Sequence, residues 1–221
     1  MFVELAGPAG AGKTTLARVL RQRQENIRVA PEIELRNLSQ IPRLAVNAPF
    51  LLSIFLKRRK LSRWFTWPEI KYILYLRSWP GYLQREEHGD VVLLDHGPVF
   101  KLAALQAFGP VSLNNPDYER WWRNEIHQWA FFLDLVVWLD APDTVLMKRI
   151  NEREQRHEIR GKPGPEARRF LKHYRISYEQ VLNSLCVHQK PPVLRFDTGQ
   201  TSIDQVAEQV LVACRLIPGR Q

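Results

Sequence analysis

Residues 2–20 read FVELAGPAGAGKTTLARVL, and this stretch decides the fold. Residues 2–6 form an apolar run of strand length, whereas residues 15–20 are mostly residues that favour a helix. Between them, residues 7–14 contain a glycine, four further residues and then Gly-Lys-Thr. This pattern, placed after a strand and before a helix, indicates a phosphate-binding P-loop.

The loop predicts a site for a nucleoside triphosphate. Its glycines permit backbone torsions that turn N–H groups toward phosphate oxygens at the start of a helix. We expect Lys13 to reach the β- and γ-phosphates and Thr14 to offer its hydroxyl to Mg²⁺. The expected cofactors are therefore ATP and Mg²⁺, with a nucleotide site made of Gly7, Pro8, Ala9, Gly10, Ala11, Gly12, Lys13, Thr14 and Thr15.

The rest of the chain alternates short apolar runs with segments of helical spacing. The apolar runs are residues 2–6, 27–30, 91–94, 135–139 and 193–196. The helical segments are residues 14–24, 68–87, 116–132, 144–157, 166–185 and 203–216. Uninterrupted apolar runs suit strands that are covered on both faces, so we predict an α/β fold of the P-loop NTPase type. It would be a doubly wound five-stranded parallel sheet flanked by helices, in a single domain over residues 1–221.

The positive charge of the chain is local. The 221 residues have a formal charge of +9. Residues 57–63 carry five basic side chains and no acidic one, and residues 148–175 carry ten basic against four acidic side chains. The remainder is close to neutral, so the charge suits a small anionic substrate better than the coating of nucleic acid. We expect no specific nucleic-acid partner.

Compartment and redox chemistry follow from simpler features. The N-terminus leads directly into the first strand, so we expect no signal peptide and a cytoplasmic protein. The most apolar stretch, residues 44–56, falls short of the roughly 20 residues that a membrane span needs. Cys186 and Cys214 lie far apart in sequence and indicate neither a disulfide framework nor a zinc site.

Four further motifs follow the later strands in order. They are Pro31-Glu32, Asp95-His96-Gly97-Pro98, Asp140-Ala141-Pro142-Asp143 and Asp197-Thr198-Gly199, and an arginine-rich segment follows the third. With the P-loop, these motifs resemble the deoxynucleoside kinase and thymidylate kinase branch of the P-loop kinases. The resemblance extends over nearly the full length of the chain.

The resemblance implies residues that act on the phosphate acceptor. In that family a glutamate after the second strand is the general base on the acceptor hydroxyl, and Glu32 matches it, with Glu34 in reserve. An acidic residue after the third strand works near Mg²⁺, and Asp95 matches it. The family has arginine next, where this chain has His96, a group that is mostly neutral near pH 7. His96 is either a substrate contact or a structural histidine, and it puts an ordinary deoxynucleoside or dTMP acceptor in doubt.

The resemblance also implies a mobile lid over residues 149–165. Arg149 matches the arginine that lies against adenine, and Arg153 matches one that holds the transferring phosphate. Arg156 is displaced by one position from the family's next arginine, Glu158 matches a lid acid that contacts the acceptor, and Thr198 lies in the loop that borders adenine. We thus predict as catalytic residues Glu32, Lys13, Asp95, Arg149 and Arg153, and as acceptor contacts Glu32, His96, Arg156 and Glu158.

The acceptor is expected to bind in the helical region of residues 33–90. Its aromatic residues either stack on a base or form core, and they are Trp64, Phe65, Trp67, Tyr72, Tyr75, Trp79 and Tyr82. Arg77 and Gln106 are further polar candidates. The basic cluster at residues 57–63 follows the apolar run at residues 44–56, and it suits a solvated turn between two helices better than contact of the region with an anionic membrane surface.

The leading hypothesis is an ATP-dependent phosphotransferase that moves the γ-phosphate to a hydroxyl or phosphate of a nucleoside, a nucleotide or a similar small acceptor. A small-molecule kinase of the antibiotic or sugar type is the alternative that His96 favours. A third hypothesis, a P-loop protein that binds nucleotide as a switch, needs neither a base nor an arginine lid. The sequence does not decide whether the chain forms a homodimer.

Overall fold

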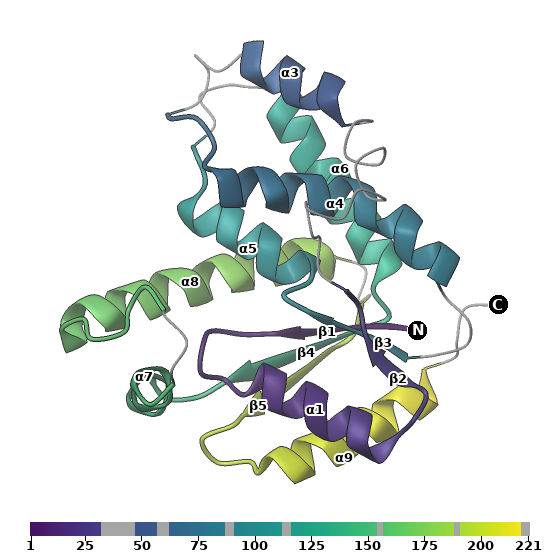
Figure 1. The fold of residues 1–221 in the computed structure, drawn as a ribbon, viewed down its shortest axis with the longest axis vertical. Helices are drawn as coiled ribbons and strands as arrows, with labels where there is room; N and C mark the ends of the chain where they lie inside the picture. The colour runs from purple at the N-terminus through teal and green to yellow at the C-terminus, as the bar shows by residue number, and fades with distance from the viewer. Residues whose placement is uncertain are drawn as a thin grey trace.

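The computed structural model describes residues 1–31, 47–56, 62–86, 91–111, 116–153, 157–187 and 191–217. Its centre is a five-stranded parallel sheet in the order β2-β3-β1-β4-β5 (Figure 1). The strands are β1 (Phe2–Ala6), β2 (Ile27–Val29), β3 (Val91–Asp95), β4 (Leu135–Asp140) and β5 (Val193–Asp197). The predicted doubly wound α/β fold is confirmed. Three strands run one residue beyond the apolar run and end on Asp95, Asp140 or Asp197, which places these carboxylates at one edge of the sheet.

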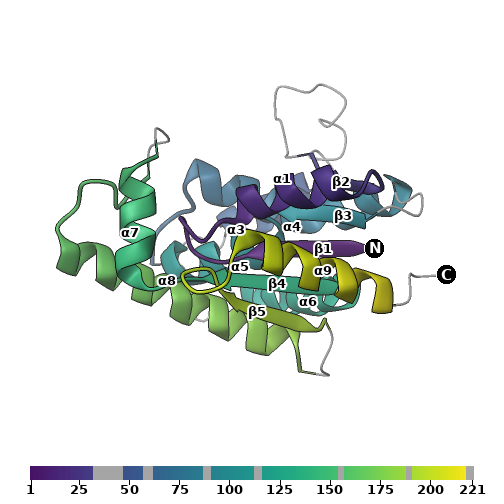
Figure 2. The ribbon, with the colours of Figure 1, turned by 90° about the horizontal axis from the view of Figure 1, so that it is seen from below.

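One face of the sheet is covered by α1 (Lys13–Arg23) and α9 (Ile203–Leu216), with α7 (Asp143–Asn151) at its end (Figure 2). Val3 and Leu5 of the central strand point to this face and are fully buried. Leu16 and Leu20 of α1 and Val206 of α9 pack in the same core. Burial of this apolar stripe seats α1 under the phosphate loop.

The opposite face is covered by α4 (Trp67–Glu86), α5 (Pro98–Phe108), α6 (Pro116–Phe132) and α8 (Gly164–Leu185), and α3 (Ala48–Leu56) lies beyond α4 and α6 (Figure 1). Phe2 and Ala6 of β1 point to this side because side chains alternate along a strand. Trp129 of α6 and Tyr178 of α8 are fully buried in this second core. The two cores lie on opposite faces of the same strands, so the sheet separates them.

Several predicted helix bounds differ from the structure. Helix α7 ends at Asn151, six residues before the predicted end, and Asn151 Oδ1 accepts a hydrogen bond from Gly161 N, which turns the chain back. Helix α8 begins at Gly164 because proline fits the first turn of a helix. Helix α3 falls in the apolar run before the expected turn, whereas α5 was not predicted, although Pro98 directly after Gly97 is a typical helix start. No helix in the described ranges is both long enough and apolar enough to cross a membrane.

Candidate active site

The phosphate loop is threaded closely against the end of β4. Gly7 has φ +136°, and a Cβ atom there would lie 2.0 Å from the carbonyl oxygen of Leu139. No side chain fits in that space, so only glycine lets the chain leave β1 in this direction. On the other side of the loop, the buried Tyr178 hydroxyl donates to Gly7 O at 3.2 Å. The first residue of the loop is therefore fixed from both β4 and α8.

Lys13 lies across this loop and is almost fully buried. Its ammonium donates to Gly7 O at 2.7 Å and to Pro8 O at 2.9 Å. Burial lowers the pKa of Lys13 to about 8, while the nearby Asp95 carboxylate acts in the opposite direction. Lys13 also lines the larger of the two cavities described below. Phosphate oxygens in that cavity would be a better partner for a charged ammonium than two neutral carbonyls.

Thr14, at the start of α1, and Asp95, at the end of β3, lie next to each other. The Thr14 hydroxyl donates to Asp95 Oδ2 at 3.3 Å. The other carboxylate oxygen, Oδ1, is buried and has no hydrogen-bond partner within the described part of the chain. A hydroxyl and a carboxylate are hard oxygen ligands of the kind that Mg²⁺ prefers, together with phosphate and water. These residues fit a magnesium site, although the described ranges hold no cluster of three acidic, histidine or cysteine ligands.

His96 also lies at the cavity wall, in a strained backbone conformation. It is the one non-glycine residue with positive φ in the described ranges, at +54°. Its ring packs against Phe100 with a centroid distance of 4.5 Å, and its carbonyl accepts a hydrogen bond from the Lys101 ammonium. A strained residue at a cavity wall is held there by its surroundings, here Phe100 and Lys101.

Arg149 joins α7 to both the phosphate loop and the loop after β5. Its guanidinium donates to Gly10 O at 3.2 Å, to the Thr198 hydroxyl at 2.9 Å and to Thr198 O at 2.8 Å. These residues line a cavity of about 460 Å³. The wall is completed by Thr15, Arg153, Ile203 and several polar residues of the loop before α9. The cavity opens beside the loop, where the sequence predicted the adenine.

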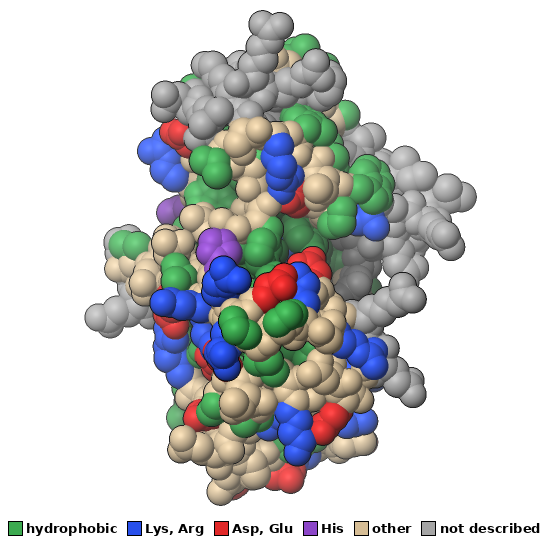
Figure 3. Space-filling model, turned by 90° about the vertical axis from the view of Figure 1, so that its left-hand side faces the viewer, with side chains coloured by type: hydrophobic (Ala, Val, Ile, Leu, Met, Phe, Trp, Pro, Cys, Tyr) green, Lys and Arg blue, Asp and Glu red, His purple; other side chains and the backbone are tan. Residues whose placement is uncertain are grey.

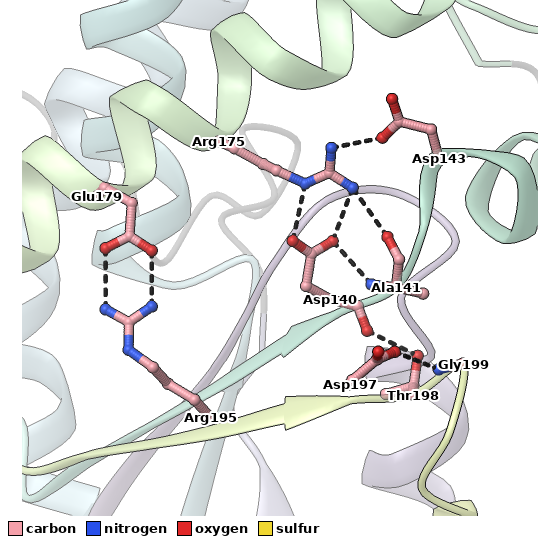
Figure 4. A network of polar contacts seen from close by, with 9 residues as sticks. All are labelled: Asp140, Ala141, Asp143, Arg175, Glu179, Arg195, Asp197, Thr198 and Gly199. Atoms are coloured by element: carbon pink, nitrogen blue, oxygen red, sulfur yellow. Dashed lines mark hydrogen bonds and ion pairs between the residues drawn. The ribbon is translucent and has the colours of Figure 1, made fainter.

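An ion-pair network links α7 and α8 to the end of β4 (Figure 4). Arg175 of α8 donates to both carboxylate oxygens of Asp140, at 2.7 and 3.0 Å, to Asp143 at 2.5 Å and to Ala141 O at 2.8 Å. Asp140 ends β4 and Asp143 begins α7. This one arginine therefore fixes where α7 starts, and with it the direction of Arg149.

The larger cavity, of about 570 Å³, begins at Lys13 and Thr14. Arg153, His157 and Glu158 line it, as the lid prediction expects for Arg153 and Glu158. Burial lowers the pKa of His157; the Glu158 carboxylate raises it in part, and the nearby Lys13 and Arg153 lower it further. Figure 3 shows basic side chains gathered on this side of the molecule. The exposed ones on α7, α8 and the turn between them include Lys148, Arg160, Lys162, Arg168, Arg169 and Lys172.

The same cavity continues away from the loop between aromatic rings. They are Tyr72 of α4, Phe100 and Phe108 of α5, and Phe170 and Tyr174 of α8. At the far end, Arg63 makes a two-pronged ion pair with Glu69, at 2.6 and 2.9 Å. The same guanidinium donates to the carbonyls of Trp64 and Phe108. Because both of its terminal nitrogens already have partners, Arg63 closes the cavity as part of the wall.

Several predicted residues lie elsewhere. Of the predicted aromatic residues, Tyr72 lines the cavity, Phe65, Tyr75 and Trp79 belong to the core, and Trp67 is exposed. Arg77 contacts Asn47 and Glu125, and Gln106 contacts Gln180, so neither points into the cavity. Glu32, Glu34, Arg156 and, within the stretch 44–63, residues 44–46 and 57–61 lie outside the described residues.

Some residues that line or support the cavities were not predicted from the sequence. Phe170, Tyr174 and Tyr178 are spaced by four residues in α8, which was a detectable aromatic stripe. Glu4, a charged residue inside an otherwise apolar strand, was another detectable signal. No sequence pattern near Lys101 predicts its contact with the His96 carbonyl, because that contact depends on how α5 packs.

Comparison with known proteins supports the fold. No family model matches the sequence, and no curated protein is similar enough to match. A YorR protein of Bacillus subtilis, solved with phosphorylated GDP, has a TM-score of 0.55 at 18% identity, covering 98% of this chain and 96% of that one. A deoxyadenosine kinase of M. mycoides, solved with dATP, has a TM-score of 0.57 at 16% identity, covering 97% and 100%. The chain has the P-loop fold of deoxynucleoside and nucleotide kinases.

Proposed function

We propose that this chain is an ATP-dependent phosphotransferase whose acceptor is a hydroxyl compound with a flat ring, such as a nucleoside. The observation that carries the proposal is the 570 Å³ cavity, whose wall combines Lys13 and Thr14 of the phosphate loop with five aromatic rings. A volume of this size suits a small ligand. The deoxyadenosine kinase of M. mycoides, which has the same fold, was solved with bound dATP and with bound dCTP, and this supports a nucleotide substrate for this chain as well.

The residues in the cavity have separate tasks in this mechanism. Lys13 and Arg153 neutralise the transferring phosphate, and Arg149 and Thr198 border the nucleotide in the neighbouring cavity. Thr14 and Asp95 would hold Mg²⁺, which neutralises phosphate charge when it is bound. Transfer depends mainly on this positioning and charge neutralisation, with the acceptor held against aromatic rings of the cavity wall such as Phe100 and Tyr174.

Glu32 is proposed as the general base that accepts the proton of the acceptor hydroxyl. The proposal comes from its place after β2 in the family-like motif Pro31-Glu32. Glu32→Gln should lower turnover by about 10² or more while ATP affinity stays within about threefold, because the base does not hold the nucleotide. A fully active Glu32→Gln protein together with an inactive Glu34→Gln protein would assign the base to Glu34.

A small-molecule kinase of another type is the second candidate. His96 favours it, because a histidine replaces the two-pronged arginine with which the family braces its substrate, and Arg63 at the far end of the cavity is already paired. A nucleotide switch is less well supported, since a protein that only binds nucleotide as a switch does not need an acceptor cavity beside the phosphate loop.

The deciding experiment is a panel of nucleosides, nucleoside monophosphates, sugars and aminoglycoside-like compounds, incubated with labelled ATP and Mg²⁺. Products are identified by mass. We expect a phosphorylated nucleoside-like compound, and no product from the Lys13→Ala protein. A product confined to sugars or aminoglycosides would select the second candidate, and labelled-phosphate release without any acceptor product would favour the switch.

A further inference from the structure

Glu4 is a buried carboxyl that the proposed mechanism does not use. It lies in the middle of β1, three residues before Gly7, and its side chain is fully buried. Burying a carboxyl in a core costs stability unless strong partners compensate for the lost water. Burial raises the pKa of Glu4 to about 8, although two backbone N–H groups and Lys101 act in the opposite direction. An apolar residue at this position would stabilise the core more than a carboxyl does. The presence of Glu4 therefore needs an explanation other than core packing.

The carboxyl of Glu4 holds the start of α5. Its Oε2 accepts the N–H of Val99 at 2.8 Å, and its Oε1 accepts the N–H of Phe100 at 2.9 Å. These donors belong to the first turn of the helix, where backbone N–H groups have no partner within the helix. Gly97 precedes that turn and provides no side-chain cap. Glu4 therefore caps α5 from a different element, the strand that leads into the phosphate loop.

The same carboxyl presses against the turn that carries Asp95 and His96. A Cβ atom on Gly97 would lie 2.7 Å from Glu4 Cδ and 2.8 Å from Leu94 Cβ. On the other side of the turn, Lys101 donates to His96 O. The strained backbone of His96 is thus confined between Glu4 and Lys101, and a small shift of Glu4 would move the turn.

We propose that Glu4 is a positioning residue, which sets the distance from the phosphate loop to Asp95 and His96 by capping α5. It does not line either cavity at the loop, so it acts through the turn and not on the substrate. This inference rests on the proposed phosphotransferase function for its kinetic readout. It has a second readout that does not require transfer, namely the Mg²⁺ dependence of nucleotide binding through Thr14 and Asp95.

The test compares Glu4→Gln with Glu125→Gln. Glu125 is an equally buried carboxyl on α6, remote from the cavities and near Arg77 at 3.9 Å. Glutamine keeps the shape of Glu4 but turns one acceptor into a donor that faces a backbone N–H. We expect turnover of Glu4→Gln to fall by about 10- to 100-fold, since a misplacement of about 1 Å can cost as much. Affinity for an ATP analogue without Mg²⁺ should stay within about threefold, and Glu125→Gln should have normal turnover.

Each other outcome has a defined meaning. The proposal would be overturned if the turnover of Glu4→Gln stayed within twofold of the wild-type value at a temperature where the variant is folded. If Glu4→Gln does not fold, Gly97→Ala takes its place, because its Cβ would collide with the Glu4 carboxyl and with Leu94 Cβ and so force the carboxyl and the turn apart. If the wild-type protein transfers phosphate to no acceptor, the proposed function has failed. The Mg²⁺ concentration for half-maximal binding of the ATP analogue then decides: a rise in Glu4→Gln alone supports positioning, and equal values in both variants refute it.

Discussion

At the phosphate loop, contacts of single atoms decide which residues are tolerated. Gly7 touches the carbonyl of Leu139 so closely that a methyl group cannot be added, whereas a Cβ on Gly81 in α4 would meet no atom within 4 Å. The two glycines therefore have opposite roles, although both follow apolar segments in the sequence. Gly7 gives the loop its path, and Gly81 only weakens an exposed helix position.

We predict opposite effects for alanine at these two positions. Gly7→Ala should abolish nucleotide binding and destabilise the protein, because the new methyl group overlaps Leu139 O at 2.0 Å. Gly81→Ala should keep full binding and raise the free energy of unfolding by about 0.5–1 kcal/mol, as expected for a helix interior. Binding of a fluorescent ATP analogue and urea unfolding of both proteins check this. Normal nucleotide affinity in Gly7→Ala would contradict the path assigned to the loop.

At the scale of elements, helices α4 and α6 enclose a second buried carboxyl. Glu125 of α6 is almost fully buried, with Arg77 of α4 at 3.9 Å. Burial raises the pKa of Glu125 from 4.5 to about 7, and Arg77 lowers it in part. The folded protein therefore holds this proton more tightly than the unfolded chain does. The contribution of Glu125 to stability is complete below about pH 4.5 and is lost as the pH rises through about 7.

We predict that Glu125→Gln flattens the pH dependence of stability. A pKa rise of this size corresponds to roughly 3 kcal/mol between pH 4.5 and pH 8. Glu4 titrates over an overlapping range, so the variant should lose only part of the fall in the free energy of unfolding. Urea unfolding at pH 5, 6, 7 and 8 measures the slope. The exposed Glu208→Gln on α9 is the control and should follow the wild type, whereas parallel curves for wild type and Glu125→Gln would refute the assignment.

Across the whole molecule, the two cores are built on opposite faces of the same strands. Phe2 and Ala6 of β1 belong to one core, and Val3 and Leu5 belong to the other. If the strands unfold, both cores are therefore lost together. The phosphate loop leaves the centre of this shared sheet. Nucleotide bound at the loop should therefore stabilise both layers together.

We predict that the protein unfolds in a single transition and that bound nucleotide stabilises the whole of it. An ATP analogue with Mg²⁺ at about 100 times its Kd should raise the free energy of unfolding by about 2.7 kcal/mol, because it binds only the folded chain. Tryptophan fluorescence reports mainly on α4, α6 and β4, whereas hydrogen exchange can be read at α1 and α9. The Lys13→Ala protein should show no shift. Two transitions, of which nucleotide moves one, would contradict a single domain.

The sequence by itself determined the features that depend on neighbouring residues. The loop of residues 7–14, the five strands and most helices were predictable, because glycine spacing, apolar runs and helical periodicity are local patterns. The family-like order of motifs gave the kinase-like fold, which the solved structures confirm. The roles given to Asp95, Arg149 and Arg153 stay predictions, as does that of Glu32.

Only the tertiary structure decided which side chains meet across the sheet. Asp95 reaches Thr14, and Arg149 reaches Thr198, because parallel strands end at one edge and bring distant loops together. The five rings of the acceptor cavity come from α4, α5 and α8, and the partner of Glu4 is a helix 95 residues further along the chain. No local pattern contains such contacts, because helix packing and strand order fix them. The sequence could place Glu4 in a strand, but only the fold shows what its carboxyl holds.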